Sequence, residues 1–282
     1  MSLKLMYITN RPEVAKIAER AGVDRIFVDM EYIGKDIRQG GMDTVKSHHT
    51  VDDVAAIKNT VKAAKVMVRV NPIHYATAEY TSSKEEIDAV IAAGADIIML
   101  PYFKTVEEVR TFVKLVAGRA VTLPLVETPE AVQSIDKILE VDGIDEIFVG
   151  LNDLSLGYGK KFMFSLLADG TVESLIVKFK RKGIPYGFGG IAALGKGALP
   201  AEKIIREHYR LGSTCVILSR SFCNTNEISD ISAITDIFFN GLRQIRDLES
   251  ECGAKLQAND RLYFDENRKE VISAVKTIMG EA

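Results

Sequence analysis

Short apolar segments alternate with helical patterns along most of this chain, and this alternation constrains the fold more than any other feature. The apolar segments are continuously hydrophobic, as expected for strands that are buried on both faces of a sheet. Strands that alternate with helices form parallel sheets with right-handed crossovers. The expected strands cover residues 3–8, 25–29, 66–70, 96–100, 121–126, 144–149, 185–190 and 214–219.

Eight such units within about 220 residues predict an α/β fold, namely a closed (β/α)8 or TIM barrel. The alternative is an open, doubly wound sheet. That fold commonly carries a GxGxxG fingerprint after its first strand, and no such sequence follows Ile8. We therefore expect the closed barrel.

The chain continues well beyond the eighth unit. Residues 228–248 have the pattern of an amphipathic helix, and residues 270–278 have a second helical pattern. We predict a barrel domain over residues 1–224 and a C-terminal helical extension over residues 225–282. The extension packs either on its own barrel or on a neighbouring subunit, and the second case makes the protein a homo-oligomer.

Composition and charge argue against several classes of partner. The chain has 282 residues, 47% of them hydrophobic, and a net charge of −3, which disfavours binding to nucleic acid or to an anionic membrane. No apolar run reaches the length of about 18 residues that spans a bilayer. The three cysteines, Cys215, Cys223 and Cys252, lack CxxC spacing, and no signal peptide is evident. A reducing, cytoplasmic location is therefore expected.

Two carboxylates follow neighbouring strands in the segment over residues 121–155. Glu127 directly follows the fifth strand, and Asp153 follows the sixth. The C-terminal ends of parallel strands lie on one face, where ligands bind. Paired carboxylates there suit a hard divalent cation. Alternatively, the acids cap helices, as Asp153 would in a following turn.

Arg69 lies between Val68 and Val70, at a position that the apolar pattern predicts to be buried. A buried arginine needs an anion. That anion is either a structural carboxylate, such as Asp29 or Glu31 after the second strand, or the carboxylate of a substrate. The sequence leaves both alternatives open.

These residues lie in stretches that resemble the HpcH/HpaI aldolase and citrate lyase family, class II pyruvate-specific aldolases on a (β/α)8 barrel. The resemblance extends from about residue 5 to about residue 220, and the stretches follow the family's order. They read AGVDRIFVDME at 21–31, VR at 68–69, GADIIMLP at 94–101, ETPEA at 127–131 and VGLNDLS at 149–155.

The resemblance implies a metal-dependent carbon–carbon lyase, or aldolase, that forms or cleaves a 4-hydroxy-2-oxo acid through the enolate of pyruvate. Its partners are then pyruvate and an aldehyde. Glu127 and Asp153 match the metal-binding acids, and the implied cofactor is Mg²⁺, Mn²⁺ or Co²⁺. Arg69 matches the arginine that steadies the keto oxygen and the enolate. The backbone N–H groups of Leu151 and Asn152 match the segment that holds the pyruvate carboxylate.

The chain departs from the family pattern in two places. Aldolases of the family typically have Asp-x-Glu-His after the second strand, and Tyr32 stands here in place of that histidine; Leu125 replaces a frequent glutamine. An insertion follows Tyr32 and offers His48 and His49. We expect His49 to assist proton transfer, because it precedes Thr50, the expected helix cap. Tyr32 is expected to orient a water or the aldehyde hydroxyl.

Arg220 follows the eighth strand, and glycines end the seventh. Loops after these strands bind phosphate in many barrels. Arg220 is therefore expected to bind an acidic or phosphorylated second substrate. Alternatively it pairs with an acid, and the glycines serve tight turns.

Two other functions remain open at this point. One is a citrate-lyase-like enzyme that acts on an acyl thioester, and the other is a non-catalytic barrel that binds a keto acid. The presence of Glu127, Asp153 and Arg69 in one chain favours an enzyme. A Schiff-base aldolase is disfavoured, because no strand from the second to the sixth presents a lysine at its C-terminal end; Lys65 lies at the start of a strand.

Overall fold

The computed structural model describes residues 2–35 and 48–280 and contains a closed barrel of eight parallel strands. Each strand pairs with the next one along the chain, and β8 pairs with β1 to close the barrel. The predicted (β/α)8 fold is therefore confirmed. The strands are β1 (Lys4–Ile8), β2 (Arg25–Asp29), β3 (Lys65–Arg69), β4 (Ile97–Leu100), β5 (Val121–Val126), β6 (Ile147–Val149), β7 (Tyr186–Ile191) and β8 (Cys215–Leu218).

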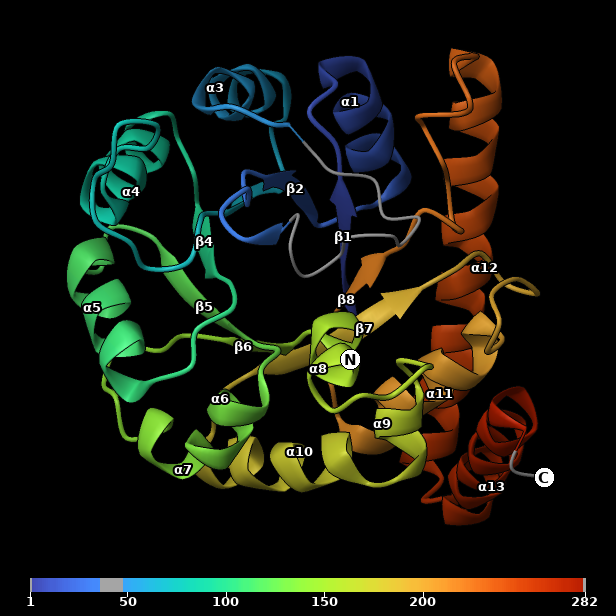
Figure 1. The fold of residues 1–282 in the computed structure, drawn as a ribbon. Helices are drawn as coiled ribbons and strands as arrows, with labels where there is room; N and C mark the ends of the chain where they lie inside the picture. Colours follow the sequence, from blue (N-terminus) through green and yellow to red (C-terminus); the bar gives the residue numbers. More distant parts are fainter. Residues whose placement is uncertain (1, 36–47, 281–282) are drawn as a thin grey trace.

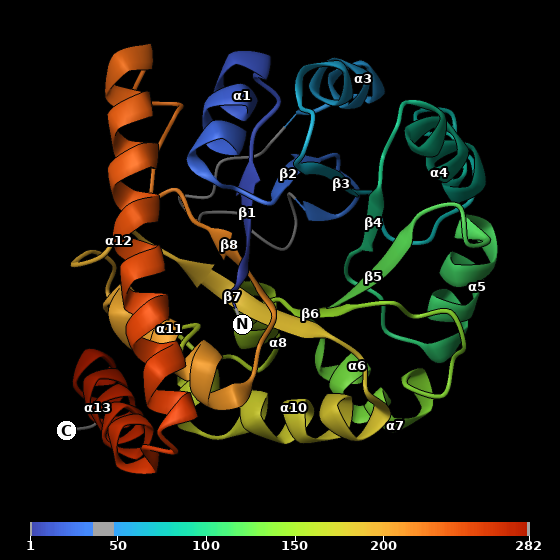
Figure 2. The same ribbon diagram turned by 180° about the vertical axis from the view of Figure 1, so that it is seen from behind.

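A layer of helices surrounds the barrel, as Figure 1 shows from one end and Figure 2 from the other. No helix within residues 2–35 and 48–280 is both long and apolar enough to cross a membrane. The helices are α1 (Pro12–Ala21), α3 (Val51–Thr60), α4 (Ser83–Ala92), α5 (Val106–Val116), α6 (Pro129–Gln133), α7 (Ile135–Ile138), α8 (Leu151–Gly157), α9 (Ser165–Ala168), α10 (Thr171–Lys182), α11 (Ala201–Leu211), α12 (Ile231–Gln257) and α13 (Arg261–Met279).

Alternate residues of the strands point into the barrel and form a core of their own. On β2, for example, Phe27 belongs to this inner core, whereas Ile26 and Val28 pack outward under the helices. The alternation follows from the pleat of a strand, in which successive side chains point to opposite faces. The inner core consists of Met6, Phe27, Met67, Ile97, Met99, Leu123, Leu125, Phe148 and Cys215.

A buried ion pair closes the N-terminal end of the barrel. Arg25 lies two residues before Phe27, and its guanidinium bonds both carboxylate oxygens of Glu146 at 2.7 and 2.8 Å. Burial raises the pKa of Glu146, but Arg25 outweighs that effect and brings this pKa below its usual value. The pair lies at the N-terminal end of the barrel, whereas ligand sites of such barrels lie at the C-terminal end.

The same alternation delivers polar groups to the C-terminal end. Asp29, Arg69 and Glu127 each lie two residues beyond an inner-core residue, and Gly150 lies two residues beyond Phe148. They therefore share the inward orientation of the apolar layer below them. The barrel thus places a ring of polar groups directly on top of its hydrophobic core.

The segment between β5 and β6 differs from its prediction. Two helices, α6 and α7, follow β5 and are separated at Ser134, whose backbone has φ −95° and ψ 6°. The sixth strand begins at Ile147 rather than at residue 144, because Asp145 instead bonds the backbone N–H of Thr122.

The C-terminal helices lie along one side of the barrel (Figures 1 and 2). Both are longer than the sequence predicted, and α13 includes the residues just before the second helical pattern. α12 packs against α1 and α11, while α13 packs against α11 and α9. The extension therefore covers its own barrel, whereas contact with a neighbouring subunit and the boundary at residue 224 stay predictions.

The predicted insertion after β2 is described only at its two ends, since residues 36–47 lie outside the described residues. The helix cap that follows it is confirmed. The Thr50 side chain accepts from the N–H of Asp53, and the Asp53 carboxylate accepts from the N–H of Thr50 at 2.7 Å. This reciprocal bonding fixes the start of α3 beside the barrel.

His208 is a fully buried histidine on the inner face of α11. Its ring stacks on Phe188 with centroids 3.8 Å apart, and its Nδ1 lies 2.8 Å from Ser213 Oγ. Within the described residues, its Nε2 has no hydrogen-bond partner. Burial lowers the pKa of His208 to about 3, so the ring is neutral in the folded protein.

We predict that His208 makes the free energy of unfolding depend on pH. The unfolded histidine titrates near pH 6.5, so between that pH and about 3 only the unfolded chain binds the proton. The contribution of the neutral His208 ring to the free energy of unfolding is therefore fully present above pH 6.5. Below that pH the free energy of unfolding falls by about 1.4 kcal/mol per pH unit. Urea denaturation across this range should show a slope smaller by one proton in His208→Gln, but not in the control His74→Gln. An unchanged slope in His208→Gln would contradict the prediction.

Candidate active site

Two cavities meet at the C-terminal mouth of the barrel, and Arg69 and Ile217 line both of them. The first, which we call the inner cavity, has a volume of about 240 Å³ and contains Glu127, Asp153 and the start of α8 in its wall. The second, which we call the outer cavity, has about 470 Å³ and lies between the ends of β1, β2 and β8. The two cavities together form the candidate site.

Glu127 and Asp153 are almost fully buried in the inner cavity, with 2% and 7% of their surfaces exposed. Glu127 Oε1 accepts the backbone N–H of Tyr102 at 2.9 Å. Its Oε2 lies so close to Gly150 that a Cβ at this glycine would be 2.8 Å away. Neither acid is a helix N-cap, since Thr128 and Gly150 hold those positions.

The electrostatics of this pair favour a cation. Burial raises the pKa of Glu127 well above its usual value, and the nearby carboxylates of Glu31 and Asp153 raise it further. A divalent ion would relieve this repulsion, and carboxylate oxygens are the donors that hard ions prefer. No group of three or more histidine, cysteine or acidic residues suited to a metal occurs within residues 2–35 and 48–280. Glu127 and Asp153 therefore fit an ion that keeps several positions for water or substrate.

Arg69 pairs with a structural carboxylate. Its Nε and Nη2 bond the two oxygens of Asp29, both at 2.8 Å, and its Nη1 lies 3.4 Å from Glu31 Oε2. The guanidinium also lies over the ring of Phe27, 5.5 Å from its centroid. The bonds to Asp29 use two of the five N–H groups of the guanidinium and fix its plane at the junction of the two cavities.

Lys35 is a site residue that the sequence analysis missed. Its ammonium lies 2.8 Å from Asp29 Oδ2 and 3.8 Å from Glu31 Oε2, and the buried side chain lines the outer cavity. Lys35 does not lie at a strand end but reaches the mouth from six residues beyond β2. Its spacing of four residues from Glu31 was the available signal.

His49 lines the outer cavity and is held by the end of β2. The backbone N–H of Asp29 donates to His49 Nδ1 at 2.9 Å, so the neutral ring carries its proton on Nε2. Burial lowers the pKa of His49 although Asp29 opposes that change. The imidazole is therefore neutral at pH 7 and presents a donor at Nε2.

Tyr32 supports His49 instead of facing either cavity. Its hydroxyl donates to the backbone carbonyl of His49, its ring stacks on His48 with centroids 5.9 Å apart, and its N–H donates to Asn71. Burial raises the pKa of Tyr32 to about 12, so the phenol remains a donor. The described residues that line the inner and outer cavities do not include Tyr32.

The remaining predicted site residues divide between the cavities. Leu151 and Asn152 line the inner cavity at the first turn of α8, beside Asp153. Arg220 lines the outer cavity and lies apart from the residues of the inner one. The structure thus groups the predicted metal ligands with the predicted keto-acid contacts, and it groups Arg220 with His49.

Comparisons with known proteins agree with this arrangement of the barrel. A family model described as HpcH/HpaI aldolase/citrate lyase matches residues 4–163, which is more than half of the chain. Two curated relatives match short segments. One is a hydroxypyruvate/pyruvate aldolase of Rhizorhabdus wittichii, 40% identical over 80 residues that cover 26% of this chain and 32% of that protein. The other is a pyruvate kinase of Methylorubrum extorquens, 35% identical over 71 residues that cover 25% of this chain and 14% of that protein.

Solved structures match over most of their length at low identity. An HpcH/HpaI aldolase from Desulfitobacterium hafniense has a TM-score of 0.61 at 16% identity, over 83% of this chain and 93% of that one. An HpcH/HpaI aldolase/citrate lyase family protein from Burkholderia cenocepacia has a TM-score of 0.60 at 16% identity. This match covers 82% of this chain and 94% of that one. The citrate synthase SbnG has a TM-score of 0.60 at 17% identity, and the match covers 92% of this chain and 95% of that one. At these identities the likeness concerns the fold.

We predict that Asp29→Asn lowers the free energy of unfolding by about 3–5 kcal/mol, because it leaves the buried Lys35 and the largely buried Arg69 without their shared carboxylate. Chemical denaturation measures the loss. The matched control is Asp136→Asn, which breaks an ion pair with Lys178 at a side chain that is 68% exposed. The control variant should lower the free energy of unfolding by less than about 1 kcal/mol. Equal losses in the two variants would show that the Asp29 cluster contributes nothing beyond a surface pair.

Proposed function

Because this chain belongs to the HpcH/HpaI aldolase/citrate lyase family, we propose that it is a metal-dependent carbon–carbon lyase acting through the enolate of pyruvate. In this proposal it forms or cleaves a 4-hydroxy-2-oxo acid. The observation that carries the proposal is the inner cavity, where two buried carboxylates and Arg69 surround a space of about 240 Å³. That combination suits a small keto acid beside a divalent cation.

Glu127 and Asp153 are the residues that would hold Mg²⁺, Mn²⁺ or Co²⁺. When bound, such an ion supplies Lewis acidity that polarises the keto group. Arg69 orients the keto oxygen and stabilises the negative charge that develops there, because its guanidinium is fixed by Asp29 at the cavity junction. The backbone N–H groups of Leu151 and Asn152, at the start of α8, hold the carboxylate of the keto acid.

His49 acts on the aldehyde side in this proposal. A base would need a lone pair directed at the substrate, but the Asp29 N–H occupies Nδ1 and leaves the proton on Nε2. His49 therefore assists by hydrogen-bonding the aldehyde oxygen as it gains charge, a role that a neutral imidazole can perform. Tyr32 positions His49 through its bond to the backbone carbonyl instead of orienting a water itself.

We predict that calorimetry will detect binding of Mg²⁺, Mn²⁺ or Co²⁺, and that pyruvate will bind more tightly when the ion is present. Glu127→Gln or Asp153→Asn should weaken ion binding by more than about 100-fold. Losing even a residue that only supports a metal ligand lowers the affinity for the metal by about 10- to 100-fold. Glu130→Gln, at an exposed acid only three residues from Glu127, is the control and should bind normally. Unchanged affinity in both ligand variants would remove the metal from the proposal.

The role of His49 gives a second prediction. His49→Ala should lower kcat for the aldol reaction of pyruvate with D-glyceraldehyde by roughly 10²-fold, the usual effect of losing a donor to a developing oxyanion. Exchange of pyruvate methyl protons with deuterated water, measured without aldehyde, should fall much less. Tyr32→Phe should reduce kcat by only about fivefold, the value of one neutral hydrogen bond. His48→Ala is the matched control. If proton exchange falls as far as kcat in His49→Ala, the histidine is the base after all.

A further inference from the structure

Lys35 is a buried cation in the wall of the outer cavity, and the proposed function gives it no role. Only 5% of its surface is exposed, and a lysine is rarely buried to that degree without a partner. Its partner is Asp29 Oδ2, at 2.8 Å. Arg69 already bonds both oxygens of Asp29. Asp29 is therefore fully bonded without Lys35, so the ammonium serves either to balance the charge of the nearby Glu31 or to act on a ligand.

The ammonium lies beside the guanidinium that separates the two cavities. Lys35 Nζ and Arg69 Nη2 bond the same oxygen, Asp29 Oδ2, each at 2.8 Å, so the two cationic groups are neighbours. Arg69 lines both cavities, whereas Lys35 lines the outer one. In the proposed function Arg69 orients the keto oxygen of pyruvate. The ammonium of Lys35 then stands on the side from which an aldehyde approaches the enolate.

Lysine differs from the arginines of this wall because it can transfer a proton. An ammonium has three N–H groups and becomes a neutral amine when it gives one proton up, whereas a guanidinium does not release its proton in a protein. Within residues 2–35 and 48–280, the hydrogen bond from Nζ goes to Asp29, and Glu31 Oε2 at 3.8 Å lies beyond hydrogen-bonding distance. Lys35 therefore has N–H groups to offer to a ligand in the outer cavity.

The other titratable groups in the described wall are poorer proton donors. Burial lowers the pKa of His49, and the neighbouring Lys35 adds to this effect, so the ring is neutral and offers only a hydrogen bond. Burial raises the pKa of Tyr7, whose hydroxyl donates to the backbone carbonyl of Cys223. Burial also raises the pKa of the Cys223 thiol. The exposed His48 is the competing donor.

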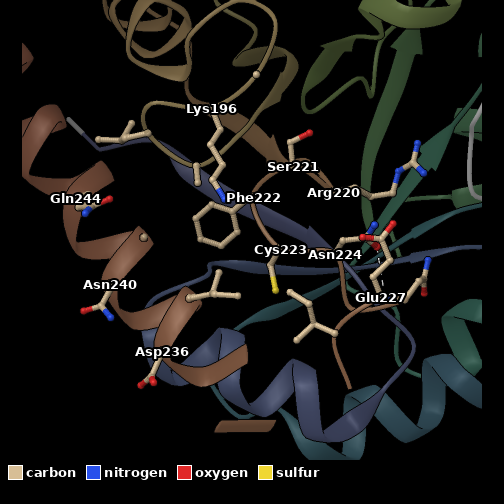
Figure 3. A pocket seen from close by; sticks show the side chains of 17 residues that line it. Lys196, Arg220, Ser221, Phe222, Cys223, Asn224, Glu227, Asp236, Asn240 and Gln244 are labelled. Carbon is tan, nitrogen blue, oxygen red and sulfur yellow. Dashed lines mark hydrogen bonds between the residues drawn. The ribbon is translucent and has the colours of Figure 1, made fainter. Parts of the chain in front are cut away.

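A groove beside the outer cavity gives solvent access to this wall. It has a volume of about 990 Å³ and lies between α12 and the loops after β7 and β8. Figure 3 shows it with Asp236 and Asn240 of α12 on one side and Arg220 and Asn224 on the other. Arg220 and Asn224 also line the outer cavity, so the two spaces adjoin. A proton that is given up in the outer cavity can therefore be replaced from water.

We propose that Lys35 is the general acid of carbon–carbon bond formation and gives a proton to the oxygen of the aldehyde. The inference rests on the proposed aldol function and adds a catalytic residue to it. The electron pair of the enolate carbon forms the new bond to the carbonyl carbon, and the π pair of the carbonyl moves onto its oxygen. His49 holds that oxygen through its Nε2–H while an ammonium proton of Lys35 passes to it.

The protons balance over the whole reaction. Pyruvate releases one methyl proton to solvent when its enolate forms. The aldehyde oxygen takes one proton from Lys35, and the neutral amine recovers one from water at the groove. In the cleavage direction the neutral amine takes the hydroxyl proton, the carbon–carbon bond breaks, and its electron pair returns to the enolate. No oxidant or further reactant is needed in either direction.

Two variants of Lys35 distinguish a proton donor from a structural cation. Lys35→Ala should lower kcat for the aldol reaction of pyruvate with D-glyceraldehyde by roughly 10²- to 10⁴-fold, the usual contribution of a general acid. Lys35→Arg keeps the positive charge but cannot give up a proton, so its kcat should fall as well. Exchange of pyruvate methyl protons without aldehyde should stay close to the wild-type rate in both variants. A wild-type kcat in Lys35→Arg would overturn the proposal, because charge alone would then suffice.

Chemical rescue tests the proton directly. Methylammonium added to Lys35→Ala should raise kcat by at least about 10-fold, because it brings an N–H acid into the space of the missing side chain. Tetramethylammonium carries the same charge without an N–H proton and should restore nothing. Methylammonium should also leave His49→Ala unchanged, since that variant retains Lys35. Equal rescue by the two ions, or rescue by neither, would overturn the proposal.

A surface lysine supplies the matched control. Lys84 also pairs with an aspartate, Asp88 at 2.6 Å, but its side chain is 70% exposed on α4. Lys84→Ala should therefore react like the wild type. His48→Ala tests the competing donor: if it loses kcat while Lys35→Ala does not, His48 gives the proton and the proposal is wrong. Circular dichroism establishes that each variant is folded.

The same measurements separate this inference from the proposed function. If the wild type exchanges pyruvate protons and Lys35→Ala keeps the wild-type kcat, the inference about Lys35 fails alone. If the wild type exchanges no pyruvate protons with Mg²⁺, Mn²⁺ or Co²⁺ present, the proposed function fails, and the role of Lys35 fails with it.

Discussion

The buried carboxylate of Asp29 is the group on which the rest of the site depends. Its two oxygens bond Arg69, one of them also bonds Lys35, and its own N–H holds His49. One residue at the end of β2 thus orients the guanidinium between the cavities and sets the tautomer of the histidine. Burial raises the pKa of Asp29, but Arg69 and Lys35 outweigh that effect and bring it below its usual value, so the acid stays ionised.

The barrel explains how these groups come together. Its strands place an apolar layer inside the barrel. Asp29, Arg69 and Glu127 are each the next inward-pointing residue after this layer, two positions further along their chains. The dry layer beneath them lowers the local dielectric, which strengthens each charged contact and also the repulsion between Glu127 and its neighbouring carboxylates. The ion pair of Arg25 and Glu146 lies at the N-terminal end of the barrel. The polar groups of the candidate site therefore lie at one mouth of the barrel.

The sequence could predict the strands, the closed barrel and the Thr50 cap, because each depends on local periodicity or spacing. It could also predict that Glu127 and Arg69 lie at strand ends. It could not choose the partner of Arg69, since pairing with Asp29 depends on how β2 and β3 align. It missed Lys35, and it assigned Tyr32 to the substrate, because the paths of side chains from a loop follow from tertiary contacts. The apolar pattern likewise does not indicate that α6 and α7 are separated at Ser134.

We propose that this barrel enolises pyruvate with the help of a divalent ion at Glu127 and Asp153. The most direct measurement is the exchange of pyruvate methyl protons in deuterated water by the wild-type protein, without any aldehyde, before and after removal of divalent ions by a chelator. If the ion is required, exchange should stop on chelation and return when Mg²⁺, Mn²⁺ or Co²⁺ is added. Pyruvate that binds without exchanging its protons, or exchange that persists in the chelator, would contradict it.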